Sequence, residues 1–216
     1  LIHEDHACPI VSVNIWYHVG SKNEVPGRTG FAHFFEHLMF EGSKHVPEGS
    51  FDTWLEGAGA NNNGSTTVDR TNYYIDGPSN ALELMLFLES DRMAYLLDTM
   101  TPERVNGQRD VVKNERRQSY ENRPYGMPEL ELEAMLFPPG HPYSWSTIGS
   151  MEDLSAASHD DVQQFFRTYY APNNASLVIG GDIDVVATQA LVEKWFAEIP
   201  RGTPVLPVAP PAAMLT

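Results

Sequence analysis

His33-Phe34-Phe35-Glu36-His37 places two histidines and a glutamate on one predicted helix. At 3.6 residues per turn, His33 and His37 lie one above the other on the same face, and Glu36 projects beside them. Two neutral imidazoles four residues apart form half of a tetrahedral zinc site, and a carboxylate beside them can take a proton from a water on the metal. The motif therefore predicts a zinc centre suited to hydrolysis.

The residues around the motif predict a helix of about three turns, roughly residues 30–41. Thr29 is its expected N-cap and Gly42 its expected stop. Its apolar side chains are Phe31, Phe34, Phe35, Leu38 and Met39. Burying two imidazoles and a carboxylate among them costs several kcal/mol unless they share a partner, and a metal ion is such a partner. The alternative is a pair of core histidines bonded to backbone carbonyls, with Glu36 at the rim.

Strands and helices follow one another irregularly along the chain. Alternating or continuous apolar residues predict strands at 11–19, 60–67, 71–75 and 175–181. Caps and breakers, among them the caps Ser50 and Thr101 and the proline Pro102, predict further helices at 50–55, 80–97, 102–120, 129–136, 158–170 and 184–199. Neighbouring strands early in the chain suit a hairpin. We therefore expect an α+β fold, a two-layer α/β sandwich with a largely antiparallel sheet packed against helices, rather than a doubly wound parallel sheet.

Length and composition restrict the possible partners. The chain has 216 residues, 42% of them hydrophobic, which suits one domain over 1–200. Five prolines from Pro200 onward predict a linker over 201–216. The net charge of −15 disfavours nucleic acid and anionic membrane surfaces and attracts cationic peptides, although it also serves solubility. No apolar run approaches the roughly 20 residues of a membrane span, so we expect no membrane insertion.

The single cysteine, Cys8, rules out an internal disulfide and a zinc site built from cysteines. This suits the cytoplasm and the bacterial periplasm alike, and of the two we favour the periplasm. The polar opening His3-Glu4-Asp5 has no signal-peptide pattern. It begins abruptly, as in a chain from which a leading segment has been removed.

A catalytic zinc site uses three protein ligands and leaves one position open, so one further ligand is required. The helix predicted from residue 102 offers three acids: Glu103, Glu115 and Glu121. Val111 and Val112, four and three residues before Glu115, connect its helix face to the core, and Gln108 falls on nearly the same stripe. A half-buried carboxylate needs a metal or a paired charge. The spacing leaves two alternatives for Glu115, a zinc ligand or a salt bridge to a nearby arginine.

These residues resemble the pitrilysin/insulinase family of zinc metallopeptidases, in which the His-Glu-x-x-His motif occurs in reverse order, as it does here. The family includes the mitochondrial processing peptidases and many bacterial zinc proteases. The resemblance covers nearly the whole chain, through 57–66, 71–74, 141–143, 147–150, 169–174 and 180–183 in the family's order. It implies the fold of the family's amino-terminal metallopeptidase domain.

The resemblance also implies a chemistry and a set of residues. His33, His37 and Glu115 would bind one Zn²⁺, and Glu36 would be the general base. The strand residues Asn63, Gly64, Ser65 and Thr66 would bind the substrate, which pairs with this strand as an extra β-strand. The implied activity is that of a zinc-dependent metalloendopeptidase acting on extended peptides.

Two features qualify this expectation. Family members often carry a second glutamate seven residues before the third ligand, where this chain has Gln108. Glutamine can hydrogen-bond to the site but supplies no negative charge, so we expect weaker metal binding or a less active water. The resemblance further implies a second homologous domain or subunit that closes a chamber and donates an arginine and a tyrosine. Residues 1–216 alone should then be weakly active or inactive.

The alternative function is that of a non-catalytic processing-peptidase-like partner or an assembly subunit, because such relatives keep the fold and lose ligands. The intact set of His33, Glu36, His37 and Glu115 favours the enzyme.

Overall fold

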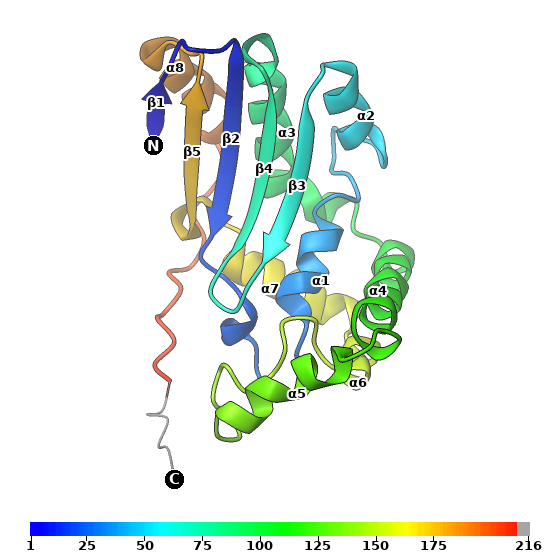
Figure 1. Cartoon of the computed structure of the whole chain (residues 1–216). Helices are drawn as coiled ribbons and strands as arrows, with labels where there is room; N and C mark the ends of the chain where they lie inside the picture. The colour runs from blue at the N-terminus through cyan, green and yellow to red at the C-terminus, as the bar shows by residue number, and fades with distance from the viewer. Residues whose placement is uncertain (211–216) are drawn as a thin grey trace.

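The computed structural model describes residues 1–210, and its sheet forms one layer against a layer of helices (Figure 1). The sheet has five strands in the order β1-β5-β2-β4-β3. Their bounds are Ile2–Glu4 for β1, Ile10–Tyr17 for β2, Asn61–Thr66 for β3, Thr71–Pro78 for β4 and Ala175–Gly181 for β5. β1 runs parallel to β5, and the other pairs are antiparallel. The expected two-layer α+β sandwich is confirmed.

β2 is the central strand of the sheet, and its alternation places every second side chain on the face that the helices cover. Val13 and Ile15 are fully buried against the helices, and Val13 lies opposite Ile75 of β4 and Ile179 of β5. The strand ends at Tyr17, two residues earlier than predicted. β3 and β4 form the predicted hairpin, and β3 is the edge strand of the sheet.

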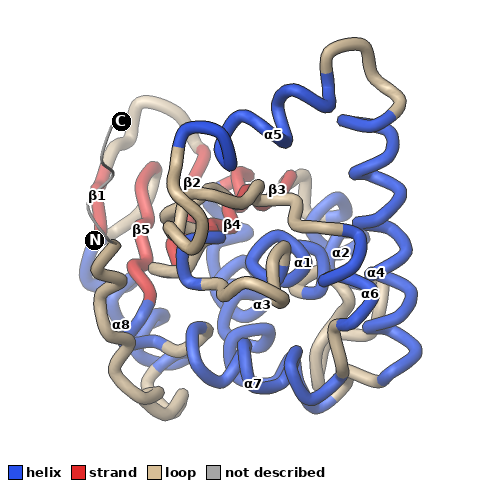
Figure 2. The backbone as a smooth tube through the Cα atoms, turned by 90° about the horizontal axis from the view of Figure 1, so that it is seen from below, coloured by secondary structure: helices blue, strands red, loops and turns tan. Residues whose placement is uncertain are grey.

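Eight α-helices accompany the sheet among the described residues. Their bounds are Phe31–Leu38 for α1, Ser50–Gly57 for α2, Leu82–Tyr95 for α3, Pro102–Arg116 for α4, Gly126–Leu136 for α5, Met151–Ala156 for α6, His159–Tyr169 for α7 and Val185–Phe196 for α8. α1 packs between α4 and α7 and lies beside one end of β3. Figure 2 shows α5 on the opposite side of the molecule from α7. No helix within residues 1–210 combines the length and the apolar character that a membrane crossing requires.

Several predicted caps and bounds are right, and others need correction. Thr101 accepts the backbone N–H of Arg104 and caps α4, as predicted. Thr29 does not cap α1, because Gly30 takes the N-cap position with φ 86°, and the Thr29 hydroxyl donates to Asp153 Oδ2 at 2.6 Å instead. Gly49 likewise replaces Ser50 as the N-cap of α2.

Other differences concern the ends of the chain and its connections. β1 and α6 are elements that the sequence did not predict, and α5 begins three residues before the predicted helix. A π-helical turn, Arg117–Glu121, links α4 to the chain that enters α5. Residues 201–210 of the predicted linker form neither helix nor strand, and its residues 211–216 lie outside the described part of the chain.

Candidate metal centre

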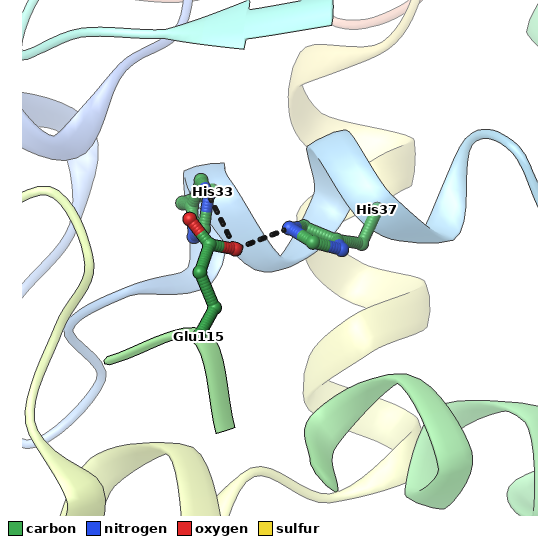
Figure 3. Close-up of side chains that lie close together, drawn as sticks. All are labelled: His33, His37 and Glu115. Atoms are coloured by element: carbon green, nitrogen blue, oxygen red, sulfur yellow. Dashed lines mark ion pairs between the residues drawn. The ribbon is translucent and has the colours of Figure 1, made fainter. Parts of the chain in front are cut away.

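The centre forms where α1 faces α4. Glu115 Oε2 lies 3.1 Å from His37 Nε2 and 3.7 Å from His33 Nε2 (Figure 3). One ligand atom from each side chain lies within 4.8 Å of the other two. Ligand atoms that are each about 2.1 Å from a tetrahedral zinc ion are about 3.4 Å apart. The three side chains are therefore spaced as a shared metal ion requires.

The chemistry of the donors also fits zinc. Burial holds the pKa of His33 well below its usual value, so the imidazole is neutral, which is the form that binds metal. A hydrogen bond with His37 lowers the pKa of Glu115, which favours the carboxylate. Two neutral imidazoles and one carboxylate make up a common zinc set that leaves one position open.

A buried glutamate outside the motif anchors the start of α1. Glu24 is 6% exposed, and its two carboxylate oxygens accept the backbone N–H groups of Gly30 at 2.9 Å and Ala32 at 2.7 Å. α1 has no side-chain cap of its own, so Glu24 satisfies N–H groups that the helix leaves free. Burial raises the pKa of Glu24 to about 8, and the helix amides act in the opposite direction. Glu24 thereby fixes the position of the turn that carries His33.

The face of α4 that carries Glu115 differs in one respect from the prediction. Val112 is fully buried, whereas Val111 is 45% exposed and lies away from the core. Only one of the two valines therefore ties the Glu115 face to the interior. Glu115 itself is partly exposed, which suits a side chain at the mouth of a site.

Glu36 lies beside the three ligand side chains and is oriented by the neighbouring strand. Thr66 donates its hydroxyl to Glu36 Oε2 at 2.6 Å. Burial raises the pKa of Glu36, which brings a carboxylate base closer to neutral pH. A Cβ atom at Gly64 would lie 3.0 Å from Glu36 Cγ, so the absence of a side chain on β3 makes room for this contact.

These side chains surround a cavity of about 250 Å³. It is lined by His33, Glu36, Gly64, Ser65, Thr66, Glu115, Tyr120, Thr147 and Ile148. Three of the four predicted substrate-binding residues therefore face this cavity. The side chain of the fourth, Asn63, is exposed and accepts the N–H of Gly64 at 2.8 Å.

Gln108 does not hydrogen-bond to the candidate ligands. Its Nε2 atom donates instead to Glu41 Oε1 at 2.5 Å, and Glu41 lies four residues after His37. Glu41 is not among the predicted site residues, although its spacing of four residues from His37 is a usable signal. Neither are Glu24, in the loop before α1, and Tyr120, in the π-helical turn after α4, because no local pattern indicates their contacts.

Comparisons with known proteins identify the family of the chain. The family model described as insulinase (peptidase family M16) matches residues 1–136, and the one described as peptidase M16 inactive domain matches residues 156–214. Because the first match covers more than half of the chain, the chain belongs to the insulinase family of peptidases. The predicted resemblance is confirmed.

The more similar relatives are bacterial proteases. Zinc protease PqqE of Helicobacter pylori is 34% identical over 195 residues, which are 88% of this chain and 42% of the relative. The probable zinc protease PqqL of Escherichia coli is 28% identical over 207 residues, which are 91% of this chain and 22% of the relative. The crystal structure of a protease from Helicobacter pylori superposes with a TM-score of 0.84 at 31% identity, covering 97% of this chain and 49% of that one. The chain thus spans less than half the length of these relatives.

Proposed function

We propose that the chain is the metal-binding domain of a zinc-dependent metalloendopeptidase. The convergence of His33, His37 and Glu115 beside Glu36 is the observation that carries this proposal. The two histidines and Glu115 would hold the ion. A bound zinc ion would supply Lewis-acid chemistry, polarising a scissile carbonyl and lowering the pKa of water.

Glu36 would move the proton. Its carboxylate accepts a proton from the attacking water and passes it to the departing amine, the usual path of general acid–base catalysis. The raised pKa of Glu36 supports this role, because a stronger carboxylate base takes a proton more readily. Thr66 would keep one oxygen of Glu36 in place and leave the other free to receive the proton.

The substrate would be an extended peptide that pairs with β3. As the edge strand of the described sheet, β3 can offer its outer N–H and C=O groups to another strand, and main-chain pairing makes little demand on the peptide sequence. Gly64, Ser65 and Thr66 line the cavity at this edge. Asn63, exposed on the same strand, would contact the substrate or its tetrahedral intermediate. The net charge of −15 would favour cationic peptides.

The surrounding assembly is part of the proposal. We propose one domain over residues 1–200, followed by a linker towards a second homologous domain or subunit that closes a chamber over the cavity. The length of the relatives supports this, since the chain covers 42% of PqqE. PqqL is described as a periplasmic protease, which supports the periplasm as the compartment.

Two substitutions in the full-length protein test the proposal. Glu36→Gln should abolish hydrolysis of a fluorogenic extended peptide while zinc content, measured by mass spectrometry, stays at one ion. Glu115→Gln should lose both zinc and activity. Glu121→Gln is the matched control, because Glu121 pairs with Arg116 at the end of the same helical segment. An active Glu36→Gln protein, or a Glu115→Gln protein that keeps its zinc, would contradict the assignment.

A non-catalytic partner or assembly subunit is the second candidate. The observation that favours it is the neutral Gln108, seven residues before Glu115. A subunit of this kind would be inactive as the wild type, so Glu36→Gln would change nothing in the peptide assay. The same experiment therefore separates the two candidates.

A further inference from the structure

A second pair of polar side chains joins the α1 segment to α4 next to the metal centre. Gln108 Nε2 donates to Glu41 Oε1 at 2.5 Å. Glu41 lies four residues beyond His37, and its N–H donates to the carbonyl of Leu38 at 3.1 Å. Its side chain therefore lies about one turn beyond that of His37, on the same side of the α1 segment. Gln108 lies about two turns before Glu115 on α4. Two contacts therefore join the α1 segment to α4, one above the other: Glu115 with the histidines, and Gln108 with Glu41.

Among the described residues the carboxylate of Glu41 forms no ion pair, although the charge of Arg104 acts favourably on it. The guanidinium of Arg104 donates to the backbone carbonyl of Glu41 at 2.9 Å and pairs with Glu48 at 3.3 Å. Among the described residues, the side-chain hydrogen-bond partner of the Glu41 carboxylate is the neutral amide of Gln108. Burial and the charge of Glu48 both disfavour the ionised form of Glu41. Arg104 is shared with Glu48 and the Glu41 carbonyl, so a further positive charge nearby would stabilise this partly desolvated carboxylate.

The candidate ligands of the metal centre need supporting hydrogen bonds or charges around them. Groups that surround metal ligands usually steady them through hydrogen bonds or charge, and their loss weakens metal binding. Within the described residues, the buried Nδ1 atom of His33 has no hydrogen-bond partner, so it receives no such support. Glu41, by contrast, lies about one helical turn beyond His37, where a positive charge on the His37 side would favour its ionised form. Support for the ion can therefore come from the His37 side of the centre.

We infer that Glu41, held by Gln108, is a second carboxylate of the metal centre. It is a positioning residue that stabilises a divalent ion held by His33, His37 and Glu115 without binding it. With two neutral imidazoles and Glu115, a divalent ion leaves one uncompensated positive charge, which Glu41 offsets. The inference rests on the proposed zinc site. It also revises the expectation that Gln108 weakens the site, because the negative charge absent at Gln108 is supplied by its partner.

The test is the zinc dissociation constant of the full-length protein, measured by competition with a chromogenic chelator. Glu41→Gln keeps an acceptor for Gln108 and removes only the charge, so zinc affinity should fall about tenfold to a hundredfold. Glu48→Gln is the matched control, because it removes a neighbouring but exposed charge. Its affinity should stay within about twofold of the wild type, since solvent screens an exposed charge.

The exchange variant Glu41→Gln/Gln108→Glu moves the carboxylate to α4 within the same contact. Its zinc affinity should return to within about threefold of the wild type, because the charge stays beside the ion. Thermal melting of the metal-free proteins should show no loss of folding in either variant. Equal zinc affinity of wild type and Glu41→Gln, or equal losses in Glu41→Gln and Glu48→Gln, would overturn the inference alone. A wild type without zinc affinity would instead overturn the proposed function, and the inference with it.

Discussion

Glu36 shows how one side chain can depend on a distant strand. Its position follows from the motif, but its orientation follows from Thr66, thirty residues away on β3, whose hydroxyl donates at 2.6 Å. A hydrogen bond to a carboxylate contributes about 1.5–3 kcal/mol. Thr66 was predicted to bind substrate, and the structure adds a contact with the proposed base.

Thr66→Val should therefore lower kcat/KM of the full-length protein for an extended peptide by about tenfold or more, the kinetic equivalent of that hydrogen bond. Zinc content should not change, because the Thr66 hydroxyl hydrogen-bonds to Glu36 and not to a candidate ligand. Thr66→Ser keeps the hydroxyl and should restore most of the activity. A Thr66→Val enzyme as fast as the wild type would show that the contact does not orient Glu36.

At the scale of an element, α1 is fixed in place at its N-terminal end. Glu24 bonds to its first N–H groups, and its Gly30 N-cap packs closely on the loop before α6. A Cβ atom at Gly30 would lie 2.8 Å from the carbonyl oxygen of Ile148 and 2.9 Å from the Cα atom of Gly149. The backbone there has φ 86°, which side chains other than glycine adopt at a cost.

Gly30→Ala should destabilise the protein by at least about 2 kcal/mol, because backbone strain and the clash act together. Gly27→Ala is the matched control, since Gly27 has the same φ of 86° with no atom within 4 Å of the added Cβ. It should cost only the strain, about 1 kcal/mol. Chemical denaturation of both variants measures the difference, and equal losses would show that the close approach at Gly30 contributes nothing.

α3 is a second element with a feature that its sequence does not indicate, a buried pair of charged side chains. Its buried residues include Glu89 and Arg92, which form an ion pair at 0% and 2% side-chain exposure. The guanidinium carbon of Arg92 also lies 4.4 Å from the ring centre of Tyr73 and 4.7 Å from that of Phe51. A charged pair on a helix normally indicates a solvated face. Here the aromatic rings of α2 and β4 cover it.

For the molecule as a whole, the proposed metal site would cross-link parts of the chain that are distant in sequence. His33 and His37 come from α1 and Glu115 from α4, so an ion bound to all three would oppose the separation of these helices. An ion that binds the folded form alone stabilises it by mass action, by about 2.7 kcal/mol when free metal is a hundred times the dissociation constant.

Removal of zinc with a chelator should therefore lower the melting temperature. For a chain of this size, 2.7 kcal/mol corresponds to about 5–10 °C, and the shift should grow with zinc concentration. Differential scanning calorimetry of the full-length protein with and without zinc measures it. Glu115→Gln should melt at the same temperature under both conditions, and a wild type insensitive to zinc would contradict a metal link between α1 and α4.

The sequence by itself determined most of the secondary structure and, through the family resemblance, the candidate ligand set. Period-two alternation predicted β2, the cap and proline at Thr101-Pro102 predicted α4, and the four-residue spacing of His33 and His37 put both on one face. These features depend on neighbours within a few residues, so local periodicity is sufficient to recognise them.

Only the tertiary structure decided which side chains those elements bring together. The bonds from Thr66 to Glu36 and from Gln108 to Glu41, the anchoring of α1 by Glu24, and the burial of Arg92 all join segments whose packing no local pattern records. A helix pattern indicates which face is apolar, but not what will lie against it. That depends on how all the elements share one core, and it determines which carboxylates lie near the metal centre.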